Sequence, residues 1–517
     1  MDLNKSLNLA NQLLAYRKIN EAETTFKEIL NFDPKNLHAL NNLGNICMEK
    51  KKFSEGMVYF DRCLKYNKNF FWALINKGTC HKYLSQYSQA LDCYEKTLKL
   101  NPNFIETYYY IGNCLLKLHK YEEAILHYEK IIKKKPNHVS AIFNKGLCFE
   151  RLKRFEIALE NYNKIIQIKK NYFLAYLHKG ICLREIHSFE DAINSYNKAI
   201  EVGSSISNFK SVAKYNLGCL QLLMGNYKDG WKNYEYREKK VKFSKNTEWK
   251  GEKNLRNKSI FIYNEQGLGD YIKYSRYLPM LKKLGAKIIL SVPNKLLPII
   301  KSMDFDFEIL DINKKNHLRF DYHCSIASLP FTFKTSIDNI PNSVPYLKVD
   351  KKIKEFWKKK IDKNKKNIGI KWTGNQNNFD DKNRSTNLYQ LKSLFDLPFN
   401  FHSLEIDYST EDKTFKKNIK NLICYDKELM GFENTGGLIE NMDLIISVDT
   451  SIAHLCGALN KSTWIILSKL PSFSWLIDCQ DSPWYPSVRL YRQDKIGDWD
   501  RVVKNIEENL KIKFILQ

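Results

Sequence analysis

Three segments in the second half of the chain place polar residues directly after apolar runs, where ligands bind and reactions occur. The apolar run 444–448 stops at Asp449-Thr450-Ser451, and the apolar residues that follow have helical spacing. A helix that begins directly after a strand leaves its first N–H groups unpaired, and such groups bind phosphate. We therefore expect Thr450 and Ser451 to contact a phosphate and Asp449 to bond to a sugar hydroxyl. His454 either contacts the same ligand or bonds back to the loop.

The second segment begins at Lys371, where an apolar run ends in small polar residues and is followed by a loop that carries cations. Arg384 in this loop can donate two hydrogen bonds from its planar guanidinium group, which suits a diphosphate. Without the Asp449 segment these would be ordinary loop residues. With it, they form a second group of donor-binding candidates: Lys371, Thr373, Gly374 and Arg384.

The third segment is Glu265-Gln266-Gly267-Leu268-Gly269-Asp270. It is not a dinucleotide-binding motif, because Ile272 stands where the third glycine is needed, and it lacks the lysine of a P-loop. An acidic residue in this turn would repel a phosphate. We interpret Asp270 either as a carboxylate that accepts a proton in catalysis or as the N-cap of the following helix, and one residue can do both.

Alternating strands and helices must position these segments. Strands are predicted at 259–263, 287–292, 307–310, 367–372, 399–404, 422–425, 444–448 and 463–467, and helices at 271–283 and 296–303. This alternation predicts βαβ units with parallel sheets, arranged as two Rossmann-like halves at 241–348 and 367–517. The lysine-rich segment 349–366 is predicted to be an exposed connecting helix. In paired halves of this kind ligands bind at the carboxyl ends of the strands, where all three segments lie.

The first half of the chain is an internal repeat. Glycines recur every 34 residues, followed twelve residues later by a second small residue and four residues after that by an aromatic one. The glycines are Gly44, Gly78, Gly112, Gly146 and Gly180, with Gly218 after 38 residues, and the aromatics are Phe60, Tyr94, Tyr128, Tyr162, Tyr196 and Tyr234. The pattern resembles the tetratricopeptide repeat over residues 1–240. It predicts an α solenoid in which the aromatic residue fills the space between adjacent repeats.

Amide side chains recur two residues before most of the glycines, at Asn42, Asn76, Asn144 and Asn216. An amide can donate and accept, so this series could hold the backbone of a peptide partner in the repeat groove. A similar asparagine series lines the repeats of the nucleocytoplasmic O-linked N-acetylglucosamine transferases. The alternative is that asparagine is simply common at this repeat position.

The composition limits the classes of function. A hydrophobic content of 43% argues against disorder, and the net charge of +26 comes from lysines scattered through every region, so we do not expect a nucleic-acid partner. Four of the twelve cysteines (Cys80, Cys114, Cys148 and Cys182) follow the 34-residue period, which predicts buried, reduced thiols and a cytoplasmic location. Neither a membrane span nor a metal-binding cysteine pattern is predicted.

The ordered set of motifs resembles the C-terminal module of bacterial tetratricopeptide-repeat glycosyltransferases, which is related to the heptosyltransferases of glycosyltransferase family 9 and has the GT-B fold. The matching segments are 265–270, 276–279, 371–374, 383–385, 449–459, 481–486, 489–493 and 497–499. The chain departs from this family at Ser472-Phe473-Ser474-Trp475, where members have Asp-Trp-Arg-Trp, and at Arg384, where a lysine is common.

The resemblance implies a metal-independent, inverting glycosyltransferase without a cofactor. Asp270 would be the general base, and the two groups of donor-binding candidates named above would bind a nucleotide sugar: Asp449, Thr450, Ser451 and His454, and Lys371, Thr373, Gly374 and Arg384. The acceptor would be a hydroxyl of a protein or glycan, which the repeats present. The alternative is an inactive repeat scaffold that only organises protein partners.

Overall fold

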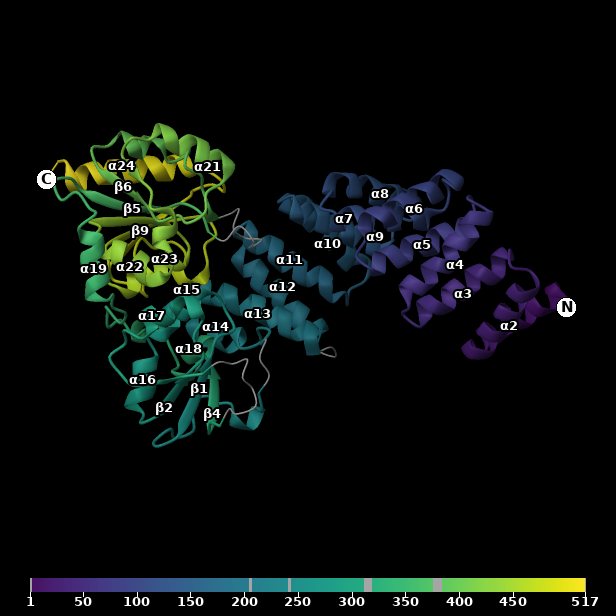
Figure 1. Cartoon of the computed structure of the whole chain (residues 1–517), viewed down its shortest axis with the longest axis horizontal. Coiled ribbons are helices and arrows are strands. Elements are labelled where there is room, and N and C mark those ends of the chain that lie inside the picture. Colours follow the sequence, from purple (N-terminus) through teal and green to yellow (C-terminus); the bar gives the residue numbers. More distant parts are fainter. Residues whose placement is uncertain (1, 204–206, 240–242, 311–318, 375–383, 517) are drawn as a thin grey trace. The chain divides into compact units, whose positions relative to one another are not determined.

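The computed structural model describes residues 2–203, 207–239, 243–310, 319–374 and 384–516 (Figure 1). The chain divides into two compact units, Met1–Phe209 and Lys210–Gln517. Among the described residues, no helix has the length and apolar character needed to cross a bilayer.

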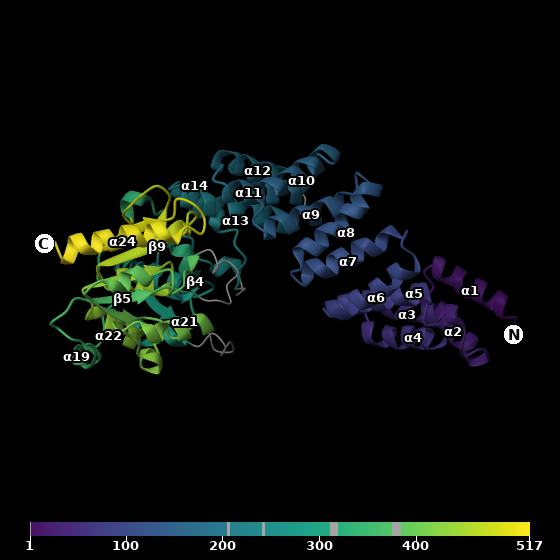
Figure 2. The same cartoon turned by 90° about the horizontal axis from the view of Figure 1, so that it is seen from above.

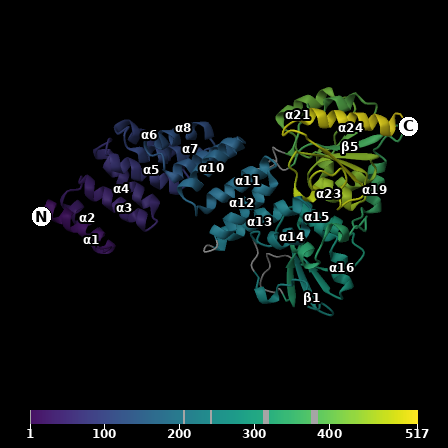
Figure 3. The ribbon, with the colours of Figure 1, turned by 180° about the vertical axis from the view of Figure 1, so that it is seen from behind.

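The first unit is a solenoid of paired antiparallel helices that follow one another in sequence order (Figures 2 and 3). Its helices are α1 (Leu3–Ala15), α2 (Ile19–Phe32), α3 (Leu37–Glu49), α4 (Phe53–Tyr66), α5 (Phe71–Tyr83), α6 (Tyr87–Leu100), α7 (Ile105–Lys117), α8 (Tyr121–Lys134), α9 (Val139–Arg151), α10 (Phe155–Ile168), α11 (Phe173–Glu185) and α12 (Phe189–Val202). The helical repeat solenoid predicted from the 34-residue period is confirmed.

A contact between glycine and an aromatic ring sets the spacing of five helix pairs. A Cβ atom added to Gly44, Gly78, Gly112, Gly146 or Gly180 would lie 2.4 to 2.9 Å from a ring carbon of the aromatic residue sixteen positions later. No real Cβ fits at that distance, so glycine is required for the ring to pack on the helix backbone. The rings of Tyr94, Tyr128, Tyr162 and Tyr196 are fully buried by this contact.

The repeating cysteines occupy one equivalent position of the solenoid. Cys80, Cys114, Cys148 and Cys182 are all inaccessible to solvent and carry free thiols. Burial raises the pKa of the Cys80 and Cys114 thiols to about 11, so they behave as small apolar side chains. The predicted burial of these four residues is confirmed.

The second unit contains most of α13 (Ser207–Leu223) and all of α14 (Tyr227–Tyr234), which form the last helix pair, and continues into two parallel sheets. The four-stranded sheet has the order β3-β2-β1-β4 and the six-stranded sheet the order β10-β9-β8-β5-β6-β7. The strands are β1 (Ser259–Tyr263), β2 (Lys287–Leu290), β3 (Glu308–Ile309), β4 (Tyr322–Ser325), β5 (Asn367–Lys371), β6 (Asn400–Ser403), β7 (Leu422–Ile423), β8 (Leu444–Val448), β9 (Thr463–Leu467) and β10 (Val488–Arg492). The predicted α/β class with parallel sheets is confirmed.

Helices cover these sheets on both sides. They are α15 (Leu268–Ser275), α16 (Leu278–Lys283), α17 (Leu297–Ile300), α18 (Leu329–Thr332), α19 (Lys351–Lys358), α21 (Thr410–Phe415), α22 (Phe432–Glu440), α23 (Ser451–Ala458) and α24 (Trp499–Phe514). In the six-stranded sheet, α21 and α24 lie on one face and α22 and α23 on the other (Figures 1 and 3).

Several elements differ from the prediction. Strands β4 and β10 were not anticipated, since Tyr-His-Cys-Ser has little strand character and β10 is an edge strand with alternating polar residues. The helix predicted at 271–283 is broken into α15 and α16 ahead of Pro279, which starts the second helix. The connecting helix α19 is shorter than 349–366 and is not simply exposed, because Trp357 is fully buried beside α22.

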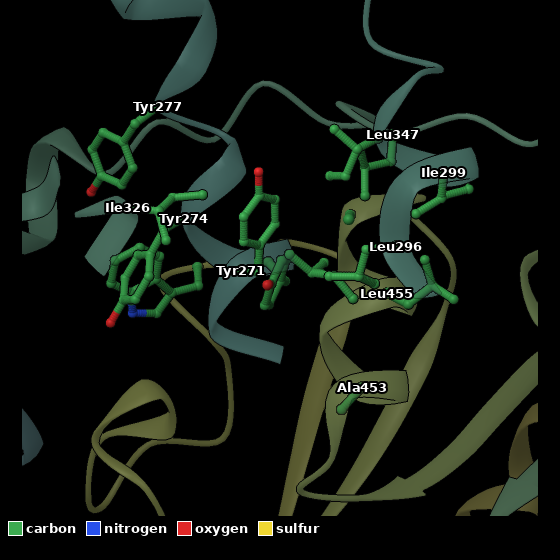
Figure 4. Close-up of a cluster of buried hydrophobic side chains, with 14 of the residues drawn as sticks. Tyr271, Tyr274, Tyr277, Leu296, Ile299, Ile326, Leu347, Ala453 and Leu455 are labelled. Carbon is green, nitrogen blue, oxygen red and sulfur yellow. The ribbon is translucent and has the colours of Figure 1, made fainter. Parts of the chain in front are cut away.

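The main core of the second unit joins the two sheets through helices α15 and α23. Tyr271 of α15 and Leu455 of α23 belong to one buried cluster, drawn in Figure 4 together with Leu296 and Leu347. All four side chains are inaccessible to solvent. The N-terminal ends of the two helices are therefore held together by packing and not by a flexible linker.

We predict that Gly112→Val destabilises the solenoid by about 1–3 kcal/mol or more, because the new side chain overlaps the buried ring of Tyr128. Tyr128→Leu alone also destabilises it, by creating a cavity. The double variant should lose less than the sum of the two single variants, as measured by denaturant unfolding. Additive losses would show that the ring does not face this glycine.

We also predict that stability falls with acid through His402, which is buried in β6 and bonds to Tyr425 and Asn367. Burial lowers the pKa of His402 from 6.5 to about 4. Between these values the unfolded chain binds a proton that the folded chain does not, so up to about 3 kcal/mol is lost as pH falls from 6.5 to 4.

The test compares the unfolding free energy of wild type, His402→Gln and His81→Gln between pH 7.5 and 4.5. We expect a smaller acid loss only in His402→Gln. Some loss will remain, since burial also lowers the pKa of His127, His323 and His454. An unchanged slope in His402→Gln would refute the assignment.

Candidate functional site

Most of the residues predicted to carry function line one pocket of about 650 Å³ in the second unit. The pocket lies where the carboxyl ends of β1, β5 and β8 meet the segments that follow them, which are helices after β1 and β8 and a loop after β5. Its lining residues are Tyr215, Tyr234, Gln266, Gly267, Leu268, Gly269, Asp270, Lys371, Gly374, Arg384, Asp449, Thr450, Ser451, His454, Ser472, Phe473 and Ser474. Segments far apart in the sequence thus meet at one site, as the rule for parallel sheets predicts.

The glycine-rich turn brings helix α15 against helix α23. A Cβ atom on Gly269 would lie 2.8 Å from Cδ2 of His454 and 3.3 Å from Cα of Ser451. Glycine at this position therefore permits the close approach of the two helices, a role different from binding a dinucleotide. Gly267 is the N-cap residue of α15, so Asp270 lies in the first turn and is not the cap.

Asp270 is held by a lysine that the sequence did not single out. Nζ of Lys273 lies 3.2 Å from Oδ1 of Asp270 and donates to Oγ of Ser474 at 2.7 Å. The Lys273 side chain is 1% exposed, whereas that of Asp270 is 31% exposed and faces the pocket. The ion pair with the buried Lys273 thus orients the carboxylate of Asp270, which stays partly accessible from the pocket. Only the i,i+3 spacing on a helix could have indicated it.

Lys273 is also surrounded by aromatic rings. Its Nζ lies 4.4 Å from the ring centre of Tyr274 and 4.7 Å from that of Phe473, and both faces favour a cation. Burial lowers the pKa of this lysine, while the negative charge of Asp270 acts in the opposite direction. The base of the pocket therefore holds a buried amino group whose charge is matched by one carboxylate.

Helix α23 presents its N-terminus to the pocket. Thr450 is the N-cap, and its Oγ1 accepts a hydrogen bond from the N–H of Ile452 at 3.3 Å. Asp449 and Thr450 are almost fully buried, and Ser451 is the first residue of the helix. The first turn of α23, with its positive dipole end, therefore lies at the pocket wall, as expected for an anion site.

His454 lines the pocket from the same helix. Its Nδ1 is bonded to the hydroxyl of Tyr485 at 3.0 Å, and its ring stacks on Trp475 at 5.1 Å between centres. The hydrogen bond therefore runs to Tyr485 and not back to the loop. Burial, together with the charges of Lys273 and Arg276, keeps the pKa of His454 well below its usual range, so the ring is neutral.

A buried carboxylate that we did not predict, that of Glu405, binds the side chain and backbone at the end of β5. Glu405 pairs with Nζ of Lys371 and accepts hydrogen bonds from the backbone N–H of Trp372 at 3.0 Å and of Thr373 at 2.7 Å. Its Oε2 also accepts from the Thr373 hydroxyl at 2.8 Å. Lys371 lines the pocket, and its positive charge is paired with the carboxylate of Glu405. Thr373 turns its hydroxyl toward Glu405 and is not among the described lining residues.

Glu405 could have been found from the sequence. It follows β6 by two positions, and β6 pairs with β5 in parallel, with Ile370 opposite Ser403. An acidic residue at this point must lie beside the end of β5.

The loop after β5 is described only in part. Arg384 lines the pocket, and its charge contributes to the lowered pKa of His454, which places the guanidinium group near α23. The backbone N–H of Gly374 donates to Oγ of Ser385 at 2.8 Å and joins the two ends of the loop. The intervening predicted residues, 375–383, lie outside the described part of the chain.

Three aromatic side chains line the pocket that were not among the candidates. They are Tyr215 of α13, Tyr234 of α14 and Phe473, with ring centres 5.7 Å apart for the first two and 5.4 Å apart for the last two. The sequence signal was present for Tyr234, which occupies the aromatic position of the repeat. That position predicted packing between repeats and not a pocket wall.

The amide series in the repeats makes hydrogen bonds to the chain itself. The amide nitrogens of Asn42, Asn76 and Asn144 donate to Asn11, Asn41 and Asn113 of the preceding repeat at 3.2, 3.1 and 2.8 Å, and that of Asn216 donates to the carbonyl of Val212 at 2.9 Å. Three of the four therefore join neighbouring repeats. Each amide has a second N–H, so contact with a peptide stays a prediction.

Comparison with known proteins identifies the repeats. Residues 71–104 and 105–138 match one family model of the tetratricopeptide repeat, and residues 37–70 and 139–172 match a second. Protein FlbA of Caulobacter vibrioides is 22% identical over 321 residues, which are 56% of this chain and 53% of FlbA. The chain thus spans about half the length of this curated relative.

Solved structures of repeat proteins are also similar to part of the chain. YrrB, described as a tetratricopeptide-repeat protein with an unusual peptide-binding site, has 18% identity and a TM-score of 0.33 and covers 37% of this chain and 96% of its own. MamA from Desulfovibrio magneticus has 22% identity and a TM-score of 0.32, over 33% of this chain and 96% of its own. The N-terminal repeats of this chain are tetratricopeptide repeats, which indicate a protein-interaction scaffold.

Proposed function

We propose that this protein is a metal-independent, inverting glycosyltransferase of the GT-B type that moves a sugar from a nucleotide-sugar donor to a hydroxyl group of a protein or glycan. One observation supports this proposal above the others. A carboxylate, Asp270, lies in one pocket with Arg384 and the N-terminus of α23, although the three come from separate parts of the second unit. A base and a diphosphate site facing one space are what glycosyl transfer requires.

In this mechanism Asp270 accepts the proton of the acceptor hydroxyl as its oxygen attacks the anomeric carbon. The bond from that carbon to the diphosphate oxygen breaks, and the nucleoside diphosphate leaves with the electron pair. Arg384 and the first N–H groups of α23 stabilise the negative charge that develops on the leaving group. Asp449 would bond to a sugar hydroxyl of the donor. His454 is neutral, so it adds no positive charge to the diphosphate site.

The repeats would bring a partner or the acceptor to this site. Lys371 contributes less than the sequence suggested, because Glu405 already matches its charge. That pairing is the observation in favour of the second candidate function, a scaffold whose α/β unit no longer turns over a donor. The two are separated by a screen of nucleotide sugars for thermal shift and for release of the nucleotide.

We predict that Asp270→Asn lowers turnover of any donor found in the screen by at least a hundredfold, because the amide cannot accept the proton. Donor affinity should change less than threefold, since the substitution preserves size. The measurement is nucleotide release against donor concentration. Asp306→Asn is the control, as Asp306 is exposed and distant in the sequence from the pocket residues. Equal turnover in Asp270→Asn would remove this residue from its proposed role.

We further predict that Lys273→Met lowers kcat about tenfold or more with little change in donor KM, because Asp270 loses the ion pair that orients it. Lys273→Arg should recover part of the loss. Lys282→Met removes an exposed lysine of neighbouring helix α16 and should match wild type. A rise in donor KM without a fall in kcat would mean that Lys273 acts on donor binding instead.

A further inference from the structure

The last helix pair keeps the repeat spacing but not the repeat packing. Tyr234 follows Gly218 by sixteen residues, as Tyr196 follows Gly180. At Gly180 an added Cβ would meet the tyrosine ring at 2.6 Å, whereas at Gly218 it would meet the backbone nitrogen of Tyr234 at 2.6 Å. The α14 backbone thus occupies the place that a ring fills in the other pairs. The ring of Tyr234 must lie elsewhere.

It lies in the wall of the pocket. Tyr234 contacts Tyr215 on one side and Phe473 on the other, with ring centres 5.7 and 5.4 Å away. The end of α14 is fixed in this position by Arg237, which donates to Oε1 of Glu265 at 2.7 Å and to Oγ of Ser328 at 2.6 Å. Since Arg237 and Glu265 are both buried, the aromatic wall is a rigid part of the site.

This wall borders the proposed base. Nζ of Lys273 is 4.7 Å from the ring centre of Phe473 and 3.2 Å from Oδ1 of Asp270, so the carboxylate and the aromatic rings are neighbours. The pKa of Tyr215 is raised mainly by Cys219 and by burial, and that of Tyr234 mainly by burial; the negative charge of Asp270 acts in the same direction on both. Arg384 and the N-terminus of α23 line the same pocket. The pocket therefore holds aromatic rings beside Asp270 together with a cation and a helix N-terminus.

We propose that Tyr215 and Phe473, with the almost fully buried ring of Tyr234 between them, form the acceptor subsite and that the acceptor is a sugar ring of a glycan. This inference rests on the proposed function and names the substrate class that was left open there. A pyranose has an apolar face of C–H groups and an edge of hydroxyls. Aromatic rings carry negative faces that attract such C–H groups, and Asp270 meets a hydroxyl at the edge.

A peptide acceptor fits this side of the pocket less well. Its serine or threonine side chain is short, so the peptide backbone would have to reach the wall beside Asp270. Backbone N–H and C=O groups need hydrogen-bonding partners when they leave water. Three aromatic rings offer few such partners. With a sugar acceptor, the new bond joins the acceptor oxygen to the anomeric carbon, the hydroxyl proton passes to Asp270 and the nucleoside diphosphate leaves.

The test measures binding of methyl glycosides of glucose, galactose, mannose and N-acetylglucosamine to the full chain by saturation-transfer NMR, with a threonine-containing peptide as the comparison. At least one glycoside should bind to wild type. Tyr215→Leu and Tyr234→Leu should weaken it tenfold or more, while Tyr234→Phe keeps the ring and most of the affinity. Tyr236→Leu is the matched control, because Tyr236 is 39% exposed and is not among the lining residues.

The outcomes separate the two proposals. Binding of no glycoside, equal binding in the two leucine variants, or binding of the peptide alone would overturn the acceptor subsite. Tyr215 is only partly buried, so its variant is informative even if Tyr234→Leu unfolds, which thermal melting reports. Nucleotide release from donors is measured in parallel. If glycosides bind as expected but no donor is turned over, the subsite stands and the proposed transferase activity fails.

Discussion

The site depends on the close contact between the first turns of α15 and α23. At Gly269 even one added carbon atom would collide with His454. The backbone of α15 therefore packs directly on a side chain of α23. Each helix carries part of the site in its first turn: Asp270 on one and Ser451 on the other. Because Tyr271 and Leu455 belong to one buried cluster behind them, the distance between Asp270 and the N-terminus of α23 is set by packing (Figure 4). A looser contact between the helices would move Asp270 away from Ser451.

The same physical device, a glycine that admits a neighbour, serves two purposes in the chain. In five helix pairs it admits an aromatic ring and produces a regular solenoid. At Gly218 it admits the backbone of α14, and the ring of Tyr234 is buried beside the pocket instead of against the glycine. A single change in which atoms face the glycine therefore places the aromatic residue of the repeat in the wall of a pocket. Nothing in the spacing of the residues differs between the two cases.

Several buried charges of the second unit are paired with neighbouring side chains of opposite charge, although the whole chain has a net charge of +26. The buried cations Lys273 and Arg237 each pair with a carboxylate, and Glu405 matches the partly buried Lys371. A buried charge without a partner costs several kcal/mol, so these pairs are conditions for folding as much as features of the site. Arg384 contributes cationic character near α23. The polarity of the pocket thus follows from the pairing of a few residues and not from the overall excess of lysine.

The sequence by itself determined the features that depend on local periodicity. The 34-residue repeat, the alternation of strands and helices and the strand-to-helix junction at Asp449 are properties of neighbouring residues, and all three are present in the structure. The rule that the carboxyl ends of parallel strands meet at one edge of a sheet was enough to predict that Asp270, Arg384 and Asp449 lie at one site. Only the tertiary structure decided that Glu405 holds Lys371, that Lys273 supports Asp270 and that Tyr234 faces the pocket. These are contacts between side chains or helices whose partner is chosen by packing, and packing density is a property of the whole fold that no local pattern encodes.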